Sequence, residues 1–433
     1  MEVVCYNMSN QESDSRLDGG DFMNYKHRAL EELTTDTLKT FKCVLVTGAR
    51  QTGKSTMLQR LFPDLNYVTL DDDFVKDQAN LNPHFFMEMN PPPAIIDEIQ
   101  KAPSLFPLVK IRCDSTNEKG LYCLSGSQPF VLMESASESL AGRVGILELA
   151  PLSFREITED TFYEPFVPTL EYIKARSKTA VKPDNLWKLI HRGGYPEIQD
   201  DAMNWNTFFS SYISTYLEKD VRSVTAVQNL ADFRRFMVAV AARTGQMLNY
   251  SNIADEVGKD KNTIRSWISI LEASGIVYIL EPYAHTALKR AIKTPKLYFR
   301  DTGLAAYLTR WMTPEQLANG AMSGQFFETY VVSEILKSYS NRGIDYRYCV
   351  SYYRGKDKKE KGEAEIDLII EENGVLYPIE IKKNEAVKAD QASAFPVLDH
   401  IEDKKRGPGA IICTCPTVGL LRDNLFAIPV HFI

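Results

Sequence analysis

Cys43-Val-Leu-Val-Thr47 runs directly into Gly48-Ala-Arg-Gln-Thr-Gly53-Lys54-Ser55 in this chain of 433 residues. The first five residues are mostly apolar and favour a strand, and the run Thr56–Leu61 behind the loop has helical character. Glycines let the backbone curl so that successive N–H groups point to one place, and a helix N-terminus adds partial positive charge there. The spacing G-x-x-x-x-G-K-[ST] is therefore that of a loop that binds nucleotide phosphates.

The side chains of this loop suit a triphosphate with Mg²⁺. Lys54 is expected to reach the β- and γ-phosphates, and the Ser55 hydroxyl is expected to bind the metal. The residues predicted to contact the nucleotide, ATP, are Gly48, Ala49, Arg50, Gln51, Thr52, Gly53, Lys54, Ser55 and Thr56.

Two acids follow a second apolar stretch, Ala94-Ile-Ile-Asp97-Glu98. Taken alone, an Asp-Glu pair after a strand is usually a solvated turn. Downstream of a phosphate loop, with room for one strand in between, the pair favours hydrolysis over mere binding. Asp97 would hold Mg²⁺ through water, and Glu98 would orient and deprotonate the attacking water.

Further candidates lie at the next strand, Tyr122–Ser125, and just beyond it. Ser125, Ser127 or Gln128 could sense the γ-phosphate or position the water, and an ordinary Ser-Gly turn is the alternative for each. Arg143 could act as an arginine finger on its own or on a neighbouring site, or it could be a surface arginine. Action on a neighbouring site would require a homo-oligomer.

Short apolar segments alternate with helical ones from Tyr25 to about Leu149, which predicts an α/β fold whose parallel sheet carries helices on both faces. Strands are expected over Cys43–Thr47, Tyr67–Leu70, Ala94–Asp97, Tyr122–Ser125 and Ile146–Leu149. The predicted division is a polar leader (1–24), a P-loop ATPase domain (25–157), a helical segment (158–229), a winged-helix-like segment (230–320) and a small α/β nuclease-like domain (321–433).

Composition limits the function classes. The net charge of −7 argues against coating nucleic acid through bulk charge, although it allows a local basic face. Apolar runs are too short to cross a bilayer, and the start of the chain lacks the pattern of a secretion signal. We therefore expect a cytoplasmic protein without membrane contact, whose seven cysteines are reduced thiols.

The stretches Tyr250–Gly258 and Asn262–Leu271 have the pattern of two short amphipathic helices around a glycine turn, and the apolar strand Ile276–Leu280 follows. This is the order of a helix-turn-helix with a wing-like strand. Residues at the start of the second helix are predicted to contact double-stranded DNA; they are Lys259, Lys261, Asn262 and Arg265. A second basic run could add phosphate contacts; it comprises Lys289, Arg290, Lys293, Lys296 and Arg300. The alternative is a protein-packing module.

Charged residues also recur on the predicted elements of the C-terminal part. Glu328 lies on an amphipathic helix, Asp367 in the strand 364–370, and Glu380 and Lys382 share one face of the strand 376–382. Carboxylates that bind a metal, beside a lysine that stabilises negative charge, suit metal-assisted phosphodiester hydrolysis. A cross-face ion pair is the ordinary alternative.

Taken together, the motifs resemble a family of prokaryotic AAA-type ATPases whose C-terminal domain of unknown function has a restriction-endonuclease-like core. The resemblance is carried by Gly48–Ser55, Ile95–Glu98, Leu124–Gln128, Ser139–Arg143, Leu149–Glu156, Gly193–Glu197, Tyr216–Val221 and Leu297–Gly303. It implies ATP binding. The C-terminal acids similarly resemble the PD-(D/E)XK nucleases, with Glu328, Asp367, Glu380 and Lys382 as the matching positions, although Ile366 stands where that family usually has proline.

These observations favour ATP hydrolysis coupled to the handling or cutting of nucleic acid. The alternative is a switch in which ATP controls assembly with a protein partner and the nuclease-like domain is catalytically inactive.

Overall fold

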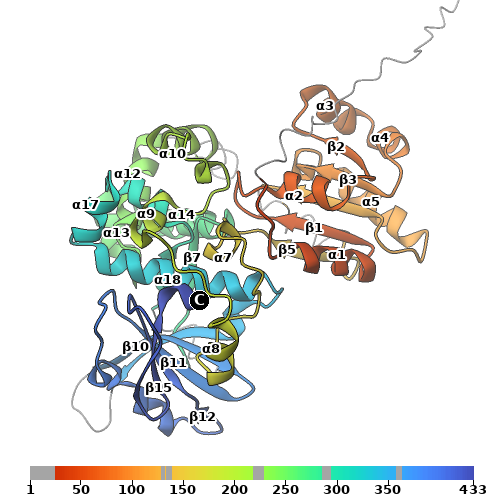
Figure 1. Cartoon of the computed structure of the whole chain (residues 1–433). Helices are drawn as coiled ribbons and strands as arrows, with labels where there is room; N and C mark the ends of the chain where they lie inside the picture. The colour runs from red at the N-terminus through yellow and green to blue at the C-terminus, as the bar shows by residue number, and fades with distance from the viewer. Residues whose placement is uncertain (1–24, 128–131, 133–138, 218–228, 285–293, 357–362) are drawn as a thin grey trace, which may run out of the picture.

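Figure 1 shows the fold of the chain as a computed structural model, with an N-terminal part in red to orange, a middle part in green to teal and a C-terminal part in blue. The structure describes residues 25–127, 132, 139–217, 229–284, 294–356 and 363–433. The predicted leader, Gln128, the basic residues 289, 290 and 293, and part of the motif Tyr216–Val221 lie outside this description. None of the helices within these ranges is long and apolar enough to cross a membrane.

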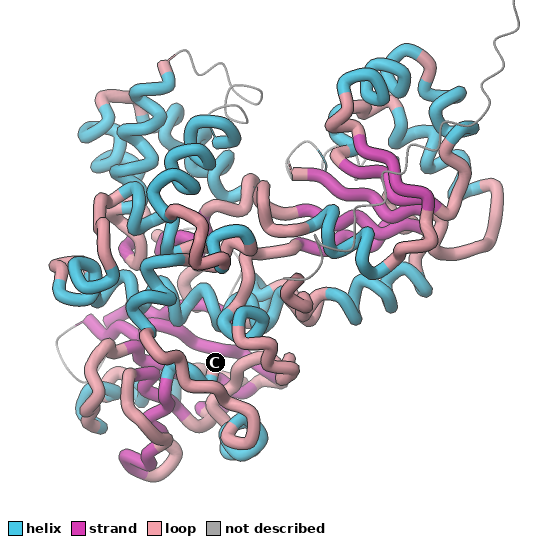
Figure 2. The backbone as a smooth tube through the Cα atoms, turned by 45° about the horizontal axis from the view of Figure 1, so that its top comes forward, coloured by secondary structure: helices cyan, strands magenta, loops and turns pink. Residues whose placement is uncertain are grey.

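The N-terminal part is built on a five-stranded parallel sheet in the order β2-β3-β4-β1-β5. Its strands are β1 (Cys43–Thr47), β2 (Asn66–Thr69), β3 (Ala94–Asp97), β4 (Tyr122–Gly126) and β5 (Val144–Glu148). Its helices are α1 (Glu31–Thr40), α2 (Lys54–Leu61), α3 (Asp73–Leu81), α4 (Pro83–Met89) and α5 (Leu105–Asp114). The predicted α/β class and all five predicted strands are confirmed, with shifts of up to two residues at the ends. Figure 2 shows the strands running side by side between helices.

Burial explains why sequence patterns found these strands. Every residue of β1, β3 and β4 is buried, as expected for strands covered on both faces. Because β4 lies between β1 and β3, the carboxyl ends of these three strands meet at one edge of the sheet. That edge carries the glycine-rich loop 48–55, the Asp97-Glu98 pair, and the serines at the end of β4 and just beyond it.

The middle part combines helices with a three-stranded antiparallel sheet in the order β6-β8-β7. Its helices are α9 (Leu186–Arg192), α10 (Trp205–Tyr212), α12 (Leu230–Ala241), α13 (Tyr250–Val257), α14 (Lys261–Ala273), α16 (Thr302–Leu308) and α17 (Pro314–Asn319). Its strands are β6 (Gln246–Met247), β7 (Val277–Leu280) and β8 (Lys296–Phe299). The two helices and the strand predicted between Tyr250 and Leu280 are thus present. Gly258 ends α13 in the left-handed conformation, and the Asp260 side chain caps α14.

The C-terminal part is a mixed sheet with the long helix α18 (Ser323–Ser340) against it. The sheet follows the order β14-β15-β13-β11-β10-β9, and β12 pairs with β11. Its strands are β9 (Val350–Lys356), β10 (Glu363–Glu372), β11 (Val375–Ile381), β12 (Lys405–Arg406), β13 (Gly409–Cys413), β14 (Gly419–Arg422) and β15 (Leu425–Pro429).

The middle and C-terminal parts share one hydrophobic core, which runs from Phe166 to Ile433 and includes most of α18. The helix α8 (Leu170–Arg176) packs against the chain end, where the Tyr172 hydroxyl donates to the carbonyl oxygen of Phe432 at 2.9 Å. Buried side chains on both sides of residue 320 thus pack together, and α8 of the predicted helical segment lies against the C-terminal part. The predicted domain division stays a prediction.

A buried ion pair ties the start of the described chain to the end of the ATPase domain. The Arg28 guanidinium lies 3.0 Å from the Glu156 carboxylate and donates to the carbonyl oxygens of Thr52 (2.6 Å) and Ala150 (2.7 Å). Burial raises the pKa of Glu156, but Arg28 and two backbone N–H donors outweigh it, so that this pKa lies below its ordinary value. The pair thus fixes the back of the glycine loop.

Replacing Glu156 by glutamine should destabilise the protein, because it leaves the Arg28 guanidinium buried without its counter-charge. The expected loss is about 3 kcal/mol or more in the free energy of unfolding, measured by urea titration. Lys39→Ala, which breaks the exposed Lys39–Asp36 pair, should change little. Equal effects of the two substitutions would contradict the role given to the buried pair.

Candidate functional site

The glycine loop has a backbone that only glycine can adopt at its ends. Gly48 has a φ of 140°, and a Cβ there would lie 2.3 Å from the carbonyl oxygen of Leu149. Gly53, at a φ of 90°, is the N-cap of α2. The loop therefore curls tightly and leads straight into a helix N-terminus, which is the arrangement that binds phosphate.

Lys54 is buried within this loop. Its ammonium donates to the carbonyl oxygens of Gly48 (3.1 Å) and Ala49 (2.8 Å). The Thr52 hydroxyl also donates to Ala49, at 2.9 Å. The lysine is thus held against the backbone of the loop, and its contact with phosphates stays a prediction.

Asp97 accepts hydrogen bonds from hydroxyl groups on two neighbouring strands and a helix. The Ser55 hydroxyl donates to its carboxylate at 2.9 Å and the Tyr67 hydroxyl at 2.9 Å, and the Ser125 hydroxyl also donates to it. The pairing of Ser55 with Asp97 brings together the two predicted magnesium ligands. Hydroxyl and carboxylate oxygens are the ligands that Mg²⁺ prefers, so these residues fit that ion.

The sequence did not indicate that Tyr67 is a hydrogen-bond partner of Asp97. Its signal was its position on β2, which pairs with β3 so that Thr69 is level with Asp97. Burial, followed by the Asp97 charge, raises the pKa of Tyr67 well above its ordinary value. Tyr67 therefore stays a neutral hydrogen-bond donor to the carboxylate.

Glu98 is 9% exposed and is held in a left-handed conformation, with a φ of 55°. Ser127 donates to its carboxylate through the hydroxyl (2.9 Å) and the backbone N–H (3.4 Å), and the Gln100 amide also donates to it. Ser127, a predicted catalytic residue, is thus a hydrogen-bond donor to Glu98, the predicted base. Gln100, which the sequence did not reveal, fixes the carboxylate from the other side.

Arg143 lies at the opposite edge of the sheet. β1 and β5 pair in parallel with Cys43 level with Val144, and the Cys43 N–H donates to the carbonyl oxygen of Arg143 at 3.1 Å. The length of β1, at about 3.3 Å per residue, separates Arg143 from the loop. Its guanidinium pairs with Asp114 at 2.5 Å. This register argues against action on its own subunit's nucleotide, and action on a neighbouring subunit stays a prediction.

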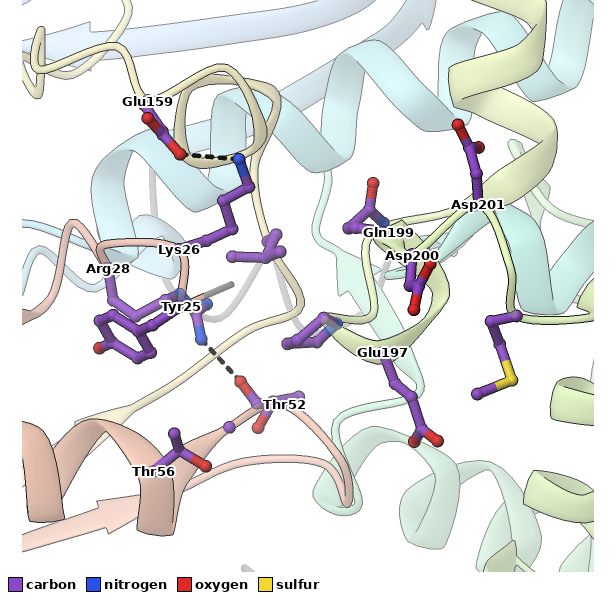
Figure 3. A pocket seen from close by; sticks show the side chains of 14 residues that line it. Tyr25, Lys26, Arg28, Thr52, Thr56, Glu159, Glu197, Gln199, Asp200 and Asp201 are labelled. Carbon is purple, nitrogen blue, oxygen red and sulfur yellow. Dashed lines mark hydrogen bonds and ion pairs between the residues drawn. The ribbon is translucent and has the colours of Figure 1, made fainter. Parts of the chain in front are cut away.

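A cleft of about 770 Å³ adjoins the loop on the side of Thr52, Gly53 and Thr56 (Figure 3). One wall comes from the start of the described chain, with Tyr25, Lys26 and Arg28. The other wall comes from the middle part and contains Pro196, Glu197, Gln199, Asp200, Asp201 and Met203. A pocket of this size between two parts of a protein suits a small organic ligand.

The middle part also contacts the loop and its surroundings directly. A Cβ on Gly275 would lie 3.3 Å from the backbone nitrogen of Ala49, so the turn before β7 sits against the loop. The Leu152 N–H donates to the carbonyl oxygen of Gly194 at 2.7 Å, and the Gly194 N–H donates to the Asp301 carboxylate at 2.6 Å. Three of the motifs that carry the family resemblance therefore meet beside the loop.

The predicted DNA-contacting residues lie at the start of α14 and just before it. Lys261, Asn262 and Arg265 are exposed, whereas Lys259 pairs with Asp232 at 2.6 Å. Lys261 and Arg265 line a groove of about 980 Å³ that extends to β10.

The prediction that the second basic run adds DNA phosphate contacts is wrong for Lys296 and Arg300, the two of its residues that the structure describes. Lys296 and Arg300 are only 4% and 8% exposed. Lys296 lies among carboxylates and Arg300 pairs with Glu148, so neither side chain is available for DNA phosphates.

The C-terminal acids lie near one another. The pairing of β10 with β11 matches Leu368 with Ile379, so the next position brings Asp367 level with Glu380. Lys382 lies 2.5 Å from the Glu380 carboxylate. Burial, followed by the Asp367 charge, raises the pKa of Glu380 to about 8 and that of Glu328 to about 7.

These acids do not fit a metal site as they stand. Across the described ranges, no group of three or more His, Cys, Asp or Glu residues could together hold a metal ion. The positive charge beside Glu328 and Asp367 comes from Lys296 instead. The metal role of Glu328, Asp367 and Glu380 stays a prediction.

Family comparisons match three consecutive stretches. Residues 40–158 match the model of an AAA domain, residues 183–315 a domain of unknown function (DUF8612), and residues 323–433 another domain of unknown function (DUF4143). With the sheet and loop described above, the first stretch is a P-loop domain of the AAA ATPase type.

Similar proteins include uncharacterized proteins of Mycobacterium bovis and Mycobacterium tuberculosis. Each is 26% identical over 362 residues, which cover 82% of this chain and 74% of the relative. Among solved structures, a Walker-type ATPase of Pyrococcus abyssi matches with 15% identity and a TM-score of 0.37, covering 64% of this chain and 94% of its own. AMPPCP-bound DnaA from Aquifex aeolicus matches with 13% identity and a TM-score of 0.28, covering 56% and 86%.

Arg143→Ala should leave the affinity of an isolated subunit for ATP unchanged, because Arg143 lies at the far edge of the sheet. Titration calorimetry with a non-hydrolysable ATP analogue at low protein concentration checks this. An affinity loss as large as that of Lys54→Ala would contradict the placement.

Proposed function

We propose that this protein binds ATP in the glycine loop and hydrolyses it. The observation that carries the proposal is the meeting, at one sheet edge, of Lys54, the Ser55–Asp97 pair and the Glu98 carboxylate. A binding-only loop has no need of a second buried carboxylate held by two donors.

In the proposed reaction, the loop N–H groups and Lys54 hold the phosphates, and Lys54 stabilises negative charge as the terminal bond breaks. Glu98 accepts a proton from the attacking water, while Ser127 and Gln100 fix the direction of its carboxylate. Ser55 and Asp97 would hold Mg²⁺, which neutralises phosphate charge when it is bound. Tyr67 and Ser125 keep Asp97 oriented toward that position.

The base and sugar of the nucleotide belong, in this proposal, in the cleft of Figure 3. Tyr25 offers an aromatic face, and Glu197, Asp200 and Asp201 offer acceptors for sugar hydroxyls. Because the far wall belongs to the middle part, nucleotide binding would draw the two parts together. Loss of the nucleotide after hydrolysis would then change the position of the middle part relative to the ATPase domain.

For the task coupled to hydrolysis, we retain nucleic-acid handling through the start of α14. The exposed Lys261, Asn262 and Arg265, beside a groove of about 980 Å³, support this role. The alternative, an ATP-controlled switch with an inactive nuclease-like domain, is favoured by one observation: Lys296 lies beside the C-terminal carboxylates. DNA-stimulated ATP turnover supports the first role, whereas nucleotide-dependent oligomerisation without any effect of DNA supports the second.

Two substitutions separate binding from hydrolysis. Lys54→Ala should weaken ATP binding roughly 10- to 100-fold, because it removes charge-assisted hydrogen bonds to phosphate. Glu98→Gln should keep ATP bound and lower kcat by about 10²- to 10⁴-fold, because it removes the base. Calorimetry and a phosphate-release assay measure the two effects, and undiminished turnover in Glu98→Gln would show that another group is the base.

Charge reversal at both Lys261 and Arg265 should weaken binding of duplex DNA and reduce the slope of log affinity against log salt by about 2. Fluorescence anisotropy across a salt series measures both quantities. Lys39→Glu, on an exposed face of the ATPase domain, makes the same type of charge change away from α14. If the α14 variant binds like the wild type, α14 is not a DNA-binding element.

A further inference from the structure

Lys296 is a buried cation that one part of the molecule inserts among the carboxylates of another. Its ammonium lies 2.8 Å from the carboxylate of Glu365, 3.5 Å from that of Glu328 and 3.9 Å from that of Asp367. Lys296 belongs to β8 of the middle sheet, whereas the acids belong to α18 and β10.

The same strand supplies a second group to these acids. The Tyr298 hydroxyl, two residues along β8 and on the same face, donates to the Glu328 carboxylate at 2.6 Å. Burial lowers the pKa of Lys296, but the charges of Glu328 and Asp367 outweigh it and raise this pKa above its ordinary value. The lysine therefore stays charged and offsets carboxylates whose burial would otherwise be costly.

We propose that Lys296 is the resident cation of this cluster and keeps divalent metal ions out of it while β8 is docked. The proposal rests on the predicted metal role of Glu328, Asp367 and Glu380. It explains why these acids lie close together without forming a metal site: the ammonium takes the place and the charge that a metal would take. The lysine thus acts as an autoinhibitory contact.

The opposite end of β8 is tied to the ATPase domain. Arg300, directly after β8, pairs with Glu148, the last residue of β5, while Gly275 before the neighbouring strand β7 sits against Ala49 of the glycine loop. A short hydrogen-bonded strand moves as a unit. In this proposal, a shift of the loop and β5 on nucleotide binding would be passed along β8 to Lys296.

The cluster also has a route to solvent. Lys296 and Glu365 line the 980 Å³ groove that reaches Lys261 and Arg265 at the start of α14. If the Lys296 ammonium were displaced, a metal ion and a phosphodiester could enter from this groove. The docked lysine thus stands at the inner end of the path that a nucleic-acid strand would use.

The test measures Mn²⁺ binding to the full chain without nucleotide, by calorimetry and by the loss of the free-ion electron paramagnetic resonance signal. Lys296→Met should bind Mn²⁺ about tenfold or more tightly than the wild type, because a buried positive charge beside the carboxylates is gone. Adding Asp367→Asn to Lys296→Met should abolish this gain. Lys404→Met, which removes a lysine paired with Glu371 in the same sheet, should bind as the wild type does.

The Mn²⁺ affinities of the wild type and of Lys296→Met decide whether Lys296 excludes metal ions. If the wild type binds Mn²⁺ at the cluster as tightly as Lys296→Met does, Lys296 does not exclude metal ions, and the metal role of the carboxylates stands. If a folded Lys296→Met binds no Mn²⁺, both the exclusion of metal by Lys296 and the metal role of the carboxylates are wrong. Lys296→Gln, which keeps a hydrogen-bond donor without the charge, replaces methionine should circular dichroism show unfolding. ATP turnover of the same preparations tests the ATPase function separately.

Discussion

The curled backbone of the glycine loop is the constraint on which the rest of the structure depends. Its first glycine packs against the backbone of Leu149, and its far side is bound by Arg28, which also pairs with Glu156. These contacts bring the start of the described chain, the loop and the exit from the ATPase domain to one point. The loop therefore contacts the segment that leads into the middle part.

The middle part contacts both the ATPase domain and the C-terminal part. The middle part touches the loop at Gly275 and walls the adjacent cleft, and it shares a hydrophobic core with the C-terminal sheet. Strand β8 lies at the centre of its own small sheet, with Arg300 beside the ATPase domain and Lys296 among the C-terminal acids. A single short strand therefore connects the ATPase domain with the C-terminal carboxylates.

Local patterns predicted much of the ATP site. The loop spacing, the apolar strands and the acids at the end of β3 are each short runs of consecutive residues, so each could be found without knowing the fold. Tyr67 and Gln100 could not be found in this way, because their roles depend on which strand lies beside Asp97 and on how the backbone turns at Glu98. Arg143 illustrates the same limit, since its position after a glycine says nothing about which sheet edge it occupies.

Sequence alone determined the parallel sheet, the glycine-rich loop, and the two short helices and strand between Tyr250 and Leu280, because periodicity and glycine spacing act over a few neighbouring residues. Tertiary structure decided how the charges are used. Lys296 and Arg300 read as DNA-binding cations in a basic run, yet burial against acids from distant segments turns both into internal ion pairs. Coulomb energy depends on the distance between charges and on the exclusion of water, and the order of residues along the chain gives neither quantity.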